Sequence, residues 1–113
     1  MRLNDFIDNY NLHDSFFESI EYDIDRSVVV LSINFAFWMQ KSYIDGTPEN
    51  GIIRVEFKNV RQYCCDGGDP VGPFVGILGA ELAEDGIIIK LLDDETNGYF
   101  EMLIESDEVE VTS

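Results

Sequence analysis

The sequence predicts a mainly β protein, with antiparallel meanders forming one sheet or a partly closed sandwich and one short N-terminal helix. Apolar and polar residues alternate with a period of two over most of the chain, which is typical of half-buried strands. The alternating runs are short and separated by turn residues, and no alternation of strands with helices is present. The 113 residues are expected to form a single domain, residues 1–113.

The helix is predicted from four apolar residues at positions i, i+3, i+4 and i+7, namely Leu3, Phe6, Ile7 and Tyr10. Two or three turns are marginal in isolation, so this helix is expected to cover one face of the sheet.

The strands follow in order. Ile20, Tyr22 and Ile24 alternate with acidic residues, and residues 28–39 give the strongest strand signal, long enough to need a bend or bulge. After a loop at 40–50, further strands are expected at 51–60, 74–82, 86–92, 98–105 and 108–111, with the longest irregular stretch at 66–73. The predicted core contains Val29, Leu31, Ile33, Phe35, Ile53, Val55 and Phe57.

A weak internal repeat relates the two halves of the chain. Residues 20–31 and 80–90 both read as a hairpin, and each is followed by a strand that opens with glycine, apolar, apolar, charged, apolar at 51–55 and 98–102. Two interpretations remain open: two similar three-stranded units, or the general likeness of any two hairpins.

The charge is strongly unbalanced, with 23 acidic residues against 7 basic ones and a formal net charge of −16. After Arg61 the only cation is Lys90, against thirteen carboxylates between Asp66 and Glu110. Such a field repels nucleic acid and anionic lipid and attracts a basic partner. We therefore expect a basic protein partner, and neither nucleic acid nor membrane binding.

No catalytic or metal site is predicted. His13, Asp14 and Ser15 are consecutive, so their side chains diverge; a structural turn, in which Asp14 or Ser15 bonds backbone N–H groups, explains them. Cys64 and Cys65 are adjacent, which suits neither a zinc site nor an unstrained disulfide. We expect free thiols, no cofactor and no metal.

Two further segments have alternative interpretations. Residues 93–98 resemble the start of a calcium loop, but position 12 would be Ile104 instead of glutamate, and a hairpin turn with positive φ at Asn97 and Gly98 explains them. The aromatic cluster around Trp38 is expected in the core, and a ligand groove is the alternative.

The acidic turns are the predicted contact surface, because their carboxylates are expected to protrude from the sheet. The partner-binding residues predicted from the sequence are Asp66, Asp69, Asp93, Asp94 and Glu95.

The segment Leu12-His13-Asp14-Ser15, followed by an Ile/Glu/Tyr/Asp strand and a long apolar strand, resembles small bacterial all-β proteins over about the first forty residues. Some of these are similar to immunity proteins of polymorphic toxin systems, small acidic cytosolic proteins whose toxins are frequently basic nucleases. The resemblance implies a non-enzymatic role in neutralising a toxin.

Two alternative functions are a small-molecule-binding or enzyme-accessory domain and a structural module of a homo-oligomer; the oligomeric state itself stays open. The start of the chain lacks the cationic and apolar regions of a signal peptide, and with the adjacent thiols this favours the cytoplasm.

Overall fold

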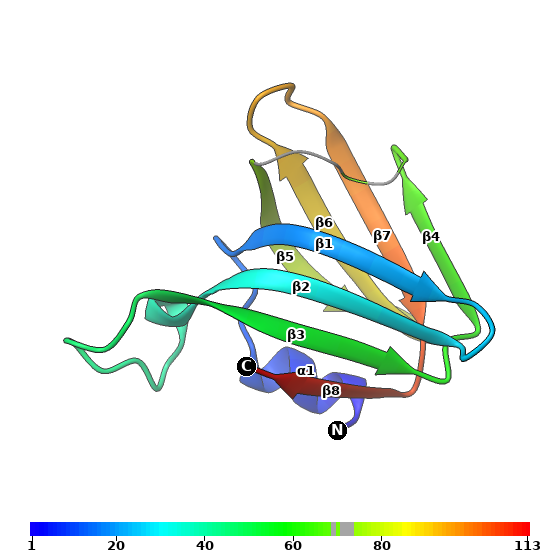
Figure 1. The fold of residues 1–113 in the computed structure, drawn as a ribbon, viewed down its shortest axis with the longest axis horizontal. Coiled ribbons are helices and arrows are strands. Elements are labelled where there is room, and N and C mark those ends of the chain that lie inside the picture. Colours follow the sequence, from blue (N-terminus) through cyan, green and yellow to red (C-terminus); the bar gives the residue numbers. More distant parts are fainter. Residues whose placement is uncertain (69, 71–73) are drawn as a thin grey trace.

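Eight strands form one antiparallel sheet in the order β4-β7-β6-β5-β1-β2-β3-β8 (Figure 1). The computed structural model describes residues 1–68, 70 and 74–113. Within these residues β4 and β8 do not pair with each other, so the sheet is open, and the predicted fold class is confirmed. The elements are α1 (Leu3–Asn9), β1 (Phe16–Asp23), β2 (Val28–Ala36), the 3-10 turn η1 (Phe37–Met39), β3 (Asn50–Lys58), β4 (Gln62–Asp66), β5 (Val75–Leu82), β6 (Gly86–Asp93), β7 (Tyr99–Glu105) and β8 (Glu108–Thr112).

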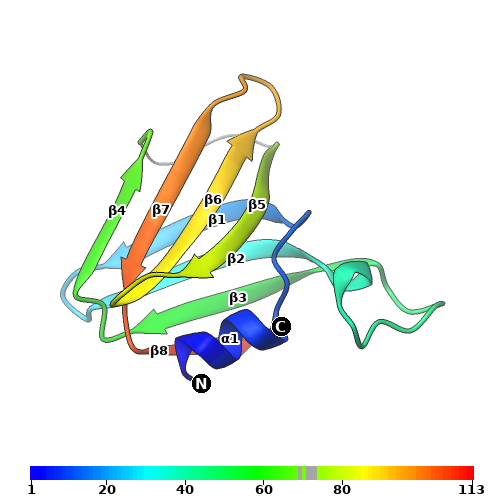
Figure 2. The ribbon, with the colours of Figure 1, turned by 180° about the vertical axis from the view of Figure 1, so that it is seen from behind.

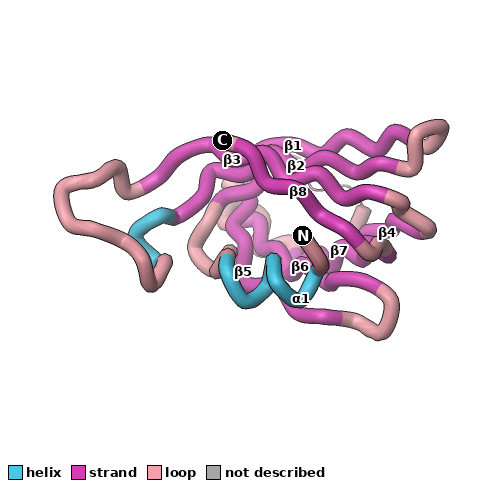
Figure 3. Tube along the Cα trace, turned by 90° about the horizontal axis from the view of Figure 1, so that it is seen from below, coloured by secondary structure: helices cyan, strands magenta, loops and turns pink. Residues whose placement is uncertain are grey.

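The sheet folds over at its centre into two half-sheets. We call β1, β2, β3 and β8 the first half-sheet, and β5, β6, β7 and β4 the second. The pairing of Phe16 with Gly76 is the one register pair between β1 and β5 among the described residues. The half-sheets cross at a large angle and face each other as two layers (Figures 1 and 3), as in orthogonally packed sandwiches.

Helix α1 lies beside β5 and β8, where it covers one open side of the two layers (Figure 2). Leu3 and Phe6 are buried, and the ring of Phe6 packs edge-on against Phe57 at a centroid distance of 6.1 Å. Tyr10 reaches Phe35 at 5.8 Å. The short helix is therefore held by the apolar stripe that its sequence predicts.

The two half-sheets have the same pairing pattern. One inward row of the first runs Tyr22–Val29–Phe57–Val109, and the matching row of the second runs Leu82–Ile87–Ile104–Tyr63. Both β1 and β5 also carry a register shift near their start, at Phe17/Ser19 and Ile77/Gly79. The interpretation of two similar three-stranded units thus agrees with the observed pairing.

The fourth strand of each half-sheet comes from the other half of the sequence. Strand β4 follows β3 along the chain and pairs with β7, whereas β8 follows β7 and pairs with β3. Two short linkers, residues 59–61 and 106–107, therefore pass beside each other at one end of the molecule.

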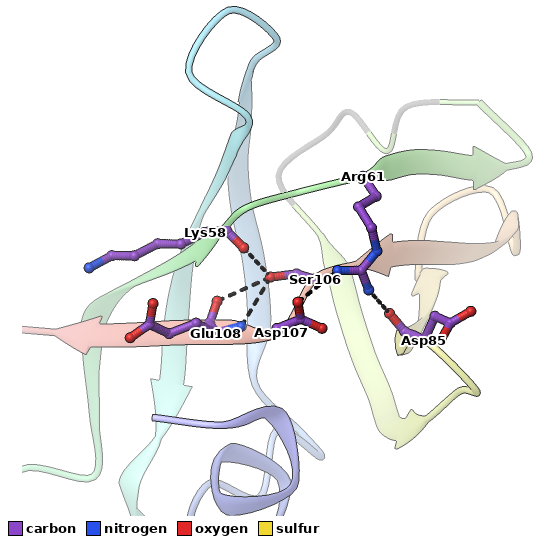
Figure 4. Close-up of polar contacts among 6 residues, drawn as sticks. All are labelled: Lys58, Arg61, Asp85, Ser106, Asp107 and Glu108. Atoms are coloured by element: carbon purple, nitrogen blue, oxygen red, sulfur yellow. Dashed lines mark hydrogen bonds and ion pairs between the residues drawn. The ribbon is translucent and has the colours of Figure 1, made fainter.

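Polar contacts hold these linkers together (Figure 4). The buried Ser106 hydroxyl donates to the carbonyl oxygen of Lys58. Arg61 donates to the Asp107 carboxylate and to the Asp85 carbonyl oxygen, each at 2.9 Å. These contacts tie the two linkers to the β5–β6 turn as well as to both half-sheets.

The predicted core is confirmed, because all seven predicted residues are at most 3% exposed. The inward residues of the second half-sheet complete it from the opposite layer. Its largest members are Ile87, Ile89, Leu91, Met102 and Ile104, all buried.

Some predicted boundaries were wrong. Strand β1 begins at Phe16, earlier than expected, and β2 ends at Ala36 instead of continuing to residue 39. The β2 strand ends there because the Ser15 hydroxyl accepts the Ala36 N–H and the Gln40 side chain donates to the Ala36 carbonyl oxygen. The expected irregularity lies in β1 and β5 instead.

Strand β4 was not predicted, since it is short and does not show a clear apolar alternation. Its residues Gln62, Cys64 and Asp66 are exposed, as suits a strand at the edge of a sheet.

Candidate partner-binding surface

The segment between α1 and β1 has a structural role at the junction of the half-sheets. The Ser15 hydroxyl is fully buried and accepts the Ala36 N–H at 2.9 Å. His13 Nδ1 donates to the Leu78 carbonyl oxygen at 2.7 Å, while its Nε2 lies 3.5 Å from the exposed Asp14 carboxylate. The structural role expected for Ser15 is present, but its hydroxyl bonds the N–H of Ala36 at the end of β2 instead of an N–H between α1 and β1. In that segment it is the Asn11 side chain that accepts a backbone N–H, that of His13.

Residues 93–98 form the hairpin turn between β6 and β7. Asp93 is only 8% exposed, and its Oδ1 accepts the N–H groups of Glu95 at 2.9 Å and Thr96 at 3.4 Å. Asn97 has the expected positive φ of 58°, but Gly98 does not. The turn is therefore built by Asp93 and Asn97.

The structure brings three of the predicted partner-binding carboxylates to one end of the second half-sheet. Asp94 and Glu95 are exposed at the β6–β7 turn, and Asp66 is exposed at the end of β4, opposite Glu101 of β7. Both lie at the upper end of the second half-sheet in Figure 1, the β6–β7 turn at the top and the end of β4 to its right. We call Asp66, Asp94 and Glu95 the acidic end.

The other two predicted residues do not belong to this group. Asp93 was expected to protrude, but it is turned into the hairpin because the backbone N–H groups of the turn need its carboxylate. Asp69 lies outside the described residues.

Most ion pairs lie away from the acidic end. Lys58 contacts Glu110 at 2.7 Å, Arg61 contacts Asp107 at 2.9 Å and Lys90 contacts Glu81 at 3.2 Å. In the part of the chain that the structure describes, no cation lies within ion-pair distance of Asp66, Asp94 or Glu95. The negative charge at this end is therefore not neutralised by the protein itself.

The pKa shifts reflect the excess of carboxylates. The hydrogen bond and charge of Glu81 raise the pKa of Lys90 above its ordinary value of 10.5. Desolvation, and then the charge of Glu101, raise the pKa of the Tyr99 phenol above 10. Tyr99 lies at the start of β7, next to the acidic end, so the negatively charged, ionised form of its phenol is disfavoured there.

A groove of about 340 Å³ lies on the outer face where β1 meets β5. We call it the junction groove. Its apolar walls are Phe16, Trp38, Leu78 and Leu92, of which Trp38 is 45% and Leu78 42% exposed. The expectation that Trp38 lies in the core was wrong: because β2 ends at Ala36, the η1 turn carries the indole out of the sheet.

The groove residues were largely missed from the sequence, although a signal for them exists. Side chains of a strand alternate between its faces, so two adjacent apolar residues cannot both point inward. Phe16-Phe17 and Ile77-Leu78 are such pairs. Phe17 and Ile77 are buried, whereas Phe16 and Leu78 are exposed on the other face.

The remaining candidates for chemistry stay separate. Cys64 is exposed and Cys65 is half-buried on β4, and no disulfide joins these two described residues. Among the described residues, no three His, Cys, Asp or Glu side chains are grouped so that they would hold a metal ion. None of the helices in residues 1–68, 70 and 74–113 has the length and hydropathy needed to cross a bilayer.

Comparisons with protein-family models, with curated proteins and with solved structures gave no match for this chain.

Proposed function

We propose that this chain is a non-enzymatic acidic protein that binds a basic protein partner, the role that immunity proteins have towards basic toxins. The observation that carries the proposal is the acidic end. Exposed carboxylates from the end of β4 and from the β6–β7 turn lie at the same end of the second half-sheet there, and no cation of the described residues lies within ion-pair distance of them. A net charge of −16 on 113 residues exceeds the magnitude of roughly 2–8 that serves solubility in a small domain.

The field of such a surface acts mainly on the rate of association. Long-range attraction steers a basic partner towards the protein, and added salt shortens its range to about 8 Å at physiological ionic strength. Two adjacent cysteines that form no disulfide with each other suit a reducing compartment, and we propose a cytoplasmic location.

The test is to measure the association of the chain with the protein encoded beside it, as a function of sodium chloride. We expect the association rate to fall as salt is raised. The triple variant Asp66→Asn, Asp94→Asn and Glu95→Gln should associate more slowly, because these carboxylates form the acidic end.

A matched variant changes the charge equally at another place. Asp25, Glu84 and Asp85 are exposed at the β1–β2 and β5–β6 turns, and their replacement by Asn, Gln and Asn should slow association less. Association that is indifferent to salt and to both triple variants would show that the charge serves solubility alone.

Repulsion within the chain gives a second readout that needs no partner. Screening weakens it, so the melting temperature should rise as sodium chloride goes from low to moderate concentration. A melting temperature that stays constant or falls over this range would contradict the importance of self-repulsion.

A small-molecule ligand is a second candidate function, and the junction groove favours it, since its volume lies at the low end of the range for ligand sites.

A further inference from the structure

The junction groove lies on an apolar band that crosses the sheet. On the outer face, Ile52, Asn34 and Phe16 stand side by side on β3, β2 and β1, and the row continues through Gly76, Leu92 and Tyr99 on β5, β6 and β7. Ile52 is 55% and Tyr99 49% exposed. Ile52, Phe16, Leu92 and Tyr99 thus give this row large side chains, with Asn34 and Gly76 between them, across the line where the two half-sheets join.

Gly76 makes the hollow in this row. It stands between Phe16 and Leu92 and carries no side chain, so the row drops to the level of the backbone there. A Cβ added at Gly76 would meet only the Leu92 carbonyl oxygen, at an ordinary contact distance of 3.8 Å. The space above Gly76 is therefore open.

The wall formed by Trp38 is held in place by the neighbouring segments. The backbone N–H of Trp38 donates to the Glu49 carbonyl oxygen at 3.2 Å. The Gln40 amide donates to the carbonyl oxygens of Ala36 and Asn11 and accepts the Asn11 N–H, which ties the η1 turn to the chain before β1. The backbone that carries the Trp38 wall is therefore fixed before a partner binds, which lowers the entropic cost of binding.

The rim of the groove is acidic. Asp14 and Asp94 belong to its lining and both are exposed, and the described residues that line it include no Lys or Arg. Asp94 is also part of the acidic end, so the groove and the acidic end form one continuous surface. An apolar hollow with carboxylates at its rim matches an apolar side chain that has cationic neighbours.

We propose that the junction groove receives an apolar anchor side chain of the basic partner, from a segment in which lysines or arginines flank that anchor. This inference rests on the proposed function and names the contact that adds affinity to electrostatic attraction. A second copy of the chain is a poor occupant, because it would bring another net charge of −16 against the same acidic rim.

Trp38 is the only tryptophan of the chain and lies in the groove wall, so its fluorescence reports occupation directly. The probes are three synthetic peptides of equal length without aromatic residues. The first has a central leucine flanked by lysines, the second has alanine in place of the leucine, and the third has glutamates in place of the lysines.

We expect the leucine peptide to shift the Trp38 emission to shorter wavelength and to bind about tenfold or more tightly than the alanine peptide, the ratio expected for burying the additional apolar surface. The glutamate peptide should not bind, because the rim repels it.

Two glycine substitutions on the same strand and face provide the matched control. Gly76→Leu fills the hollow and should abolish the preference for the leucine peptide. Gly79→Leu lies outside the groove lining, where an added Cβ meets nothing within 4 Å, and should leave the preference unchanged. If Gly76→Leu does not fold, Leu78→Lys at the exposed wall residue should abolish the preference by repulsion.

The outcomes separate this inference from the proposed function. Equal binding of the leucine and alanine peptides, binding without a change in Trp38 emission, or no binding of either cationic peptide would overturn the groove as an anchor site. The proposed function would still stand if the protein partner associates with the expected salt dependence, and it fails only if that dependence is absent.

Discussion

Ser15 shows how one polar side chain sets the geometry of the junction. Its buried hydroxyl satisfies the Ala36 N–H at the point where β2 ends. Ser15→Ala should leave that N–H without a partner and lower the free energy of unfolding by about 1–3 kcal/mol. Urea unfolding measures this, with Ser19→Ala at an exposed position of β1 as the control, which should change stability by less than about 0.5 kcal/mol. Equal effects of the two variants would rule out the assigned role.

The ion pair between Lys58 and Glu110 gives the stability a defined pH dependence. The hydrogen bond and charge of Lys58 lower the pKa of Glu110 below 4.5, and the same bond raises the pKa of Lys58 above 10.5. The lowered pKa means that Glu110 stabilises the fold above pH 4.5 and loses this contribution as pH falls further. The raised pKa means that Lys58 contributes below pH 10.5 and loses its contribution as pH rises further.

Glu110→Gln should therefore destabilise the protein between pH 4.5 and pH 10.5. The loss should be small because the ion pair is exposed to solvent. Denaturation curves of the variant and the original protein should converge steadily as the pH is lowered below 4.5. A difference that stays constant from pH 7 to pH 3 would mean that the substitution acts through packing and not through charge.

At the scale of elements, Gly86 controls how closely β6 approaches β7. A Cβ on this residue would overlap the Ile104 carbonyl oxygen of β7, and backbone cannot move aside as a side chain can. Gly86→Ala should therefore separate the start of the two strands and cost about 1–3 kcal/mol. Gly79→Ala, where a Cβ meets nothing within 4 Å, should be close to neutral. Thermal unfolding of the two variants tests this, and a neutral Gly86→Ala would contradict the close approach.

The inward faces of the strands could be predicted from the sequence, because the alternation of side chains is a property of each strand alone. Val29, Leu31 and Ile33 are buried as predicted. Neither β4 nor its pairing with β7 could be predicted, since its five residues show no clear apolar alternation and nothing local distinguishes β3 from β7 as its neighbour. That choice depends on the linkers and on packing between the layers, which local patterns do not contain.

The candidate surface could be predicted only in part, for a similar reason. Hairpin turns expose acidic residues, which holds for Asp94 and Glu95, but a carboxylate such as Asp93 can instead bond the turn itself. The exposure of Trp38 depends on the end of β2, which contacts from Ser15 and Gln40 determine. Residues distant in sequence therefore decide which aromatic side chain lines the groove.

At the scale of the whole molecule, the exchange of β4 and β8 makes each half-sheet depend on the other. The first half-sheet needs Val109 from the end of the chain, and the second needs β4 from its middle. The fourth strand of each half-sheet comes from the other half of the sequence. Neither half of the sequence is therefore expected to be stable without the other. Both half-sheets line the junction groove, so it requires the two to be packed together.

We therefore expect the chain to unfold in one cooperative transition. Trp38 fluorescence reports on the junction, and hydrogen exchange of the β6 and β7 amides reports on the second half-sheet; both should give the same denaturation midpoint. Removing residues 108–113 takes β8 from the first half-sheet and leaves the linker residue Asp107 in place. It should nevertheless lower both midpoints equally, because the half-sheets are interlocked by the crossing linkers. Removing only Ser113, which is exposed and outside β8, should change neither. If the truncation lowers the fluorescence midpoint and leaves the exchange of β6 and β7 unaffected, the half-sheets are independent units and the exchanged strands do not couple them.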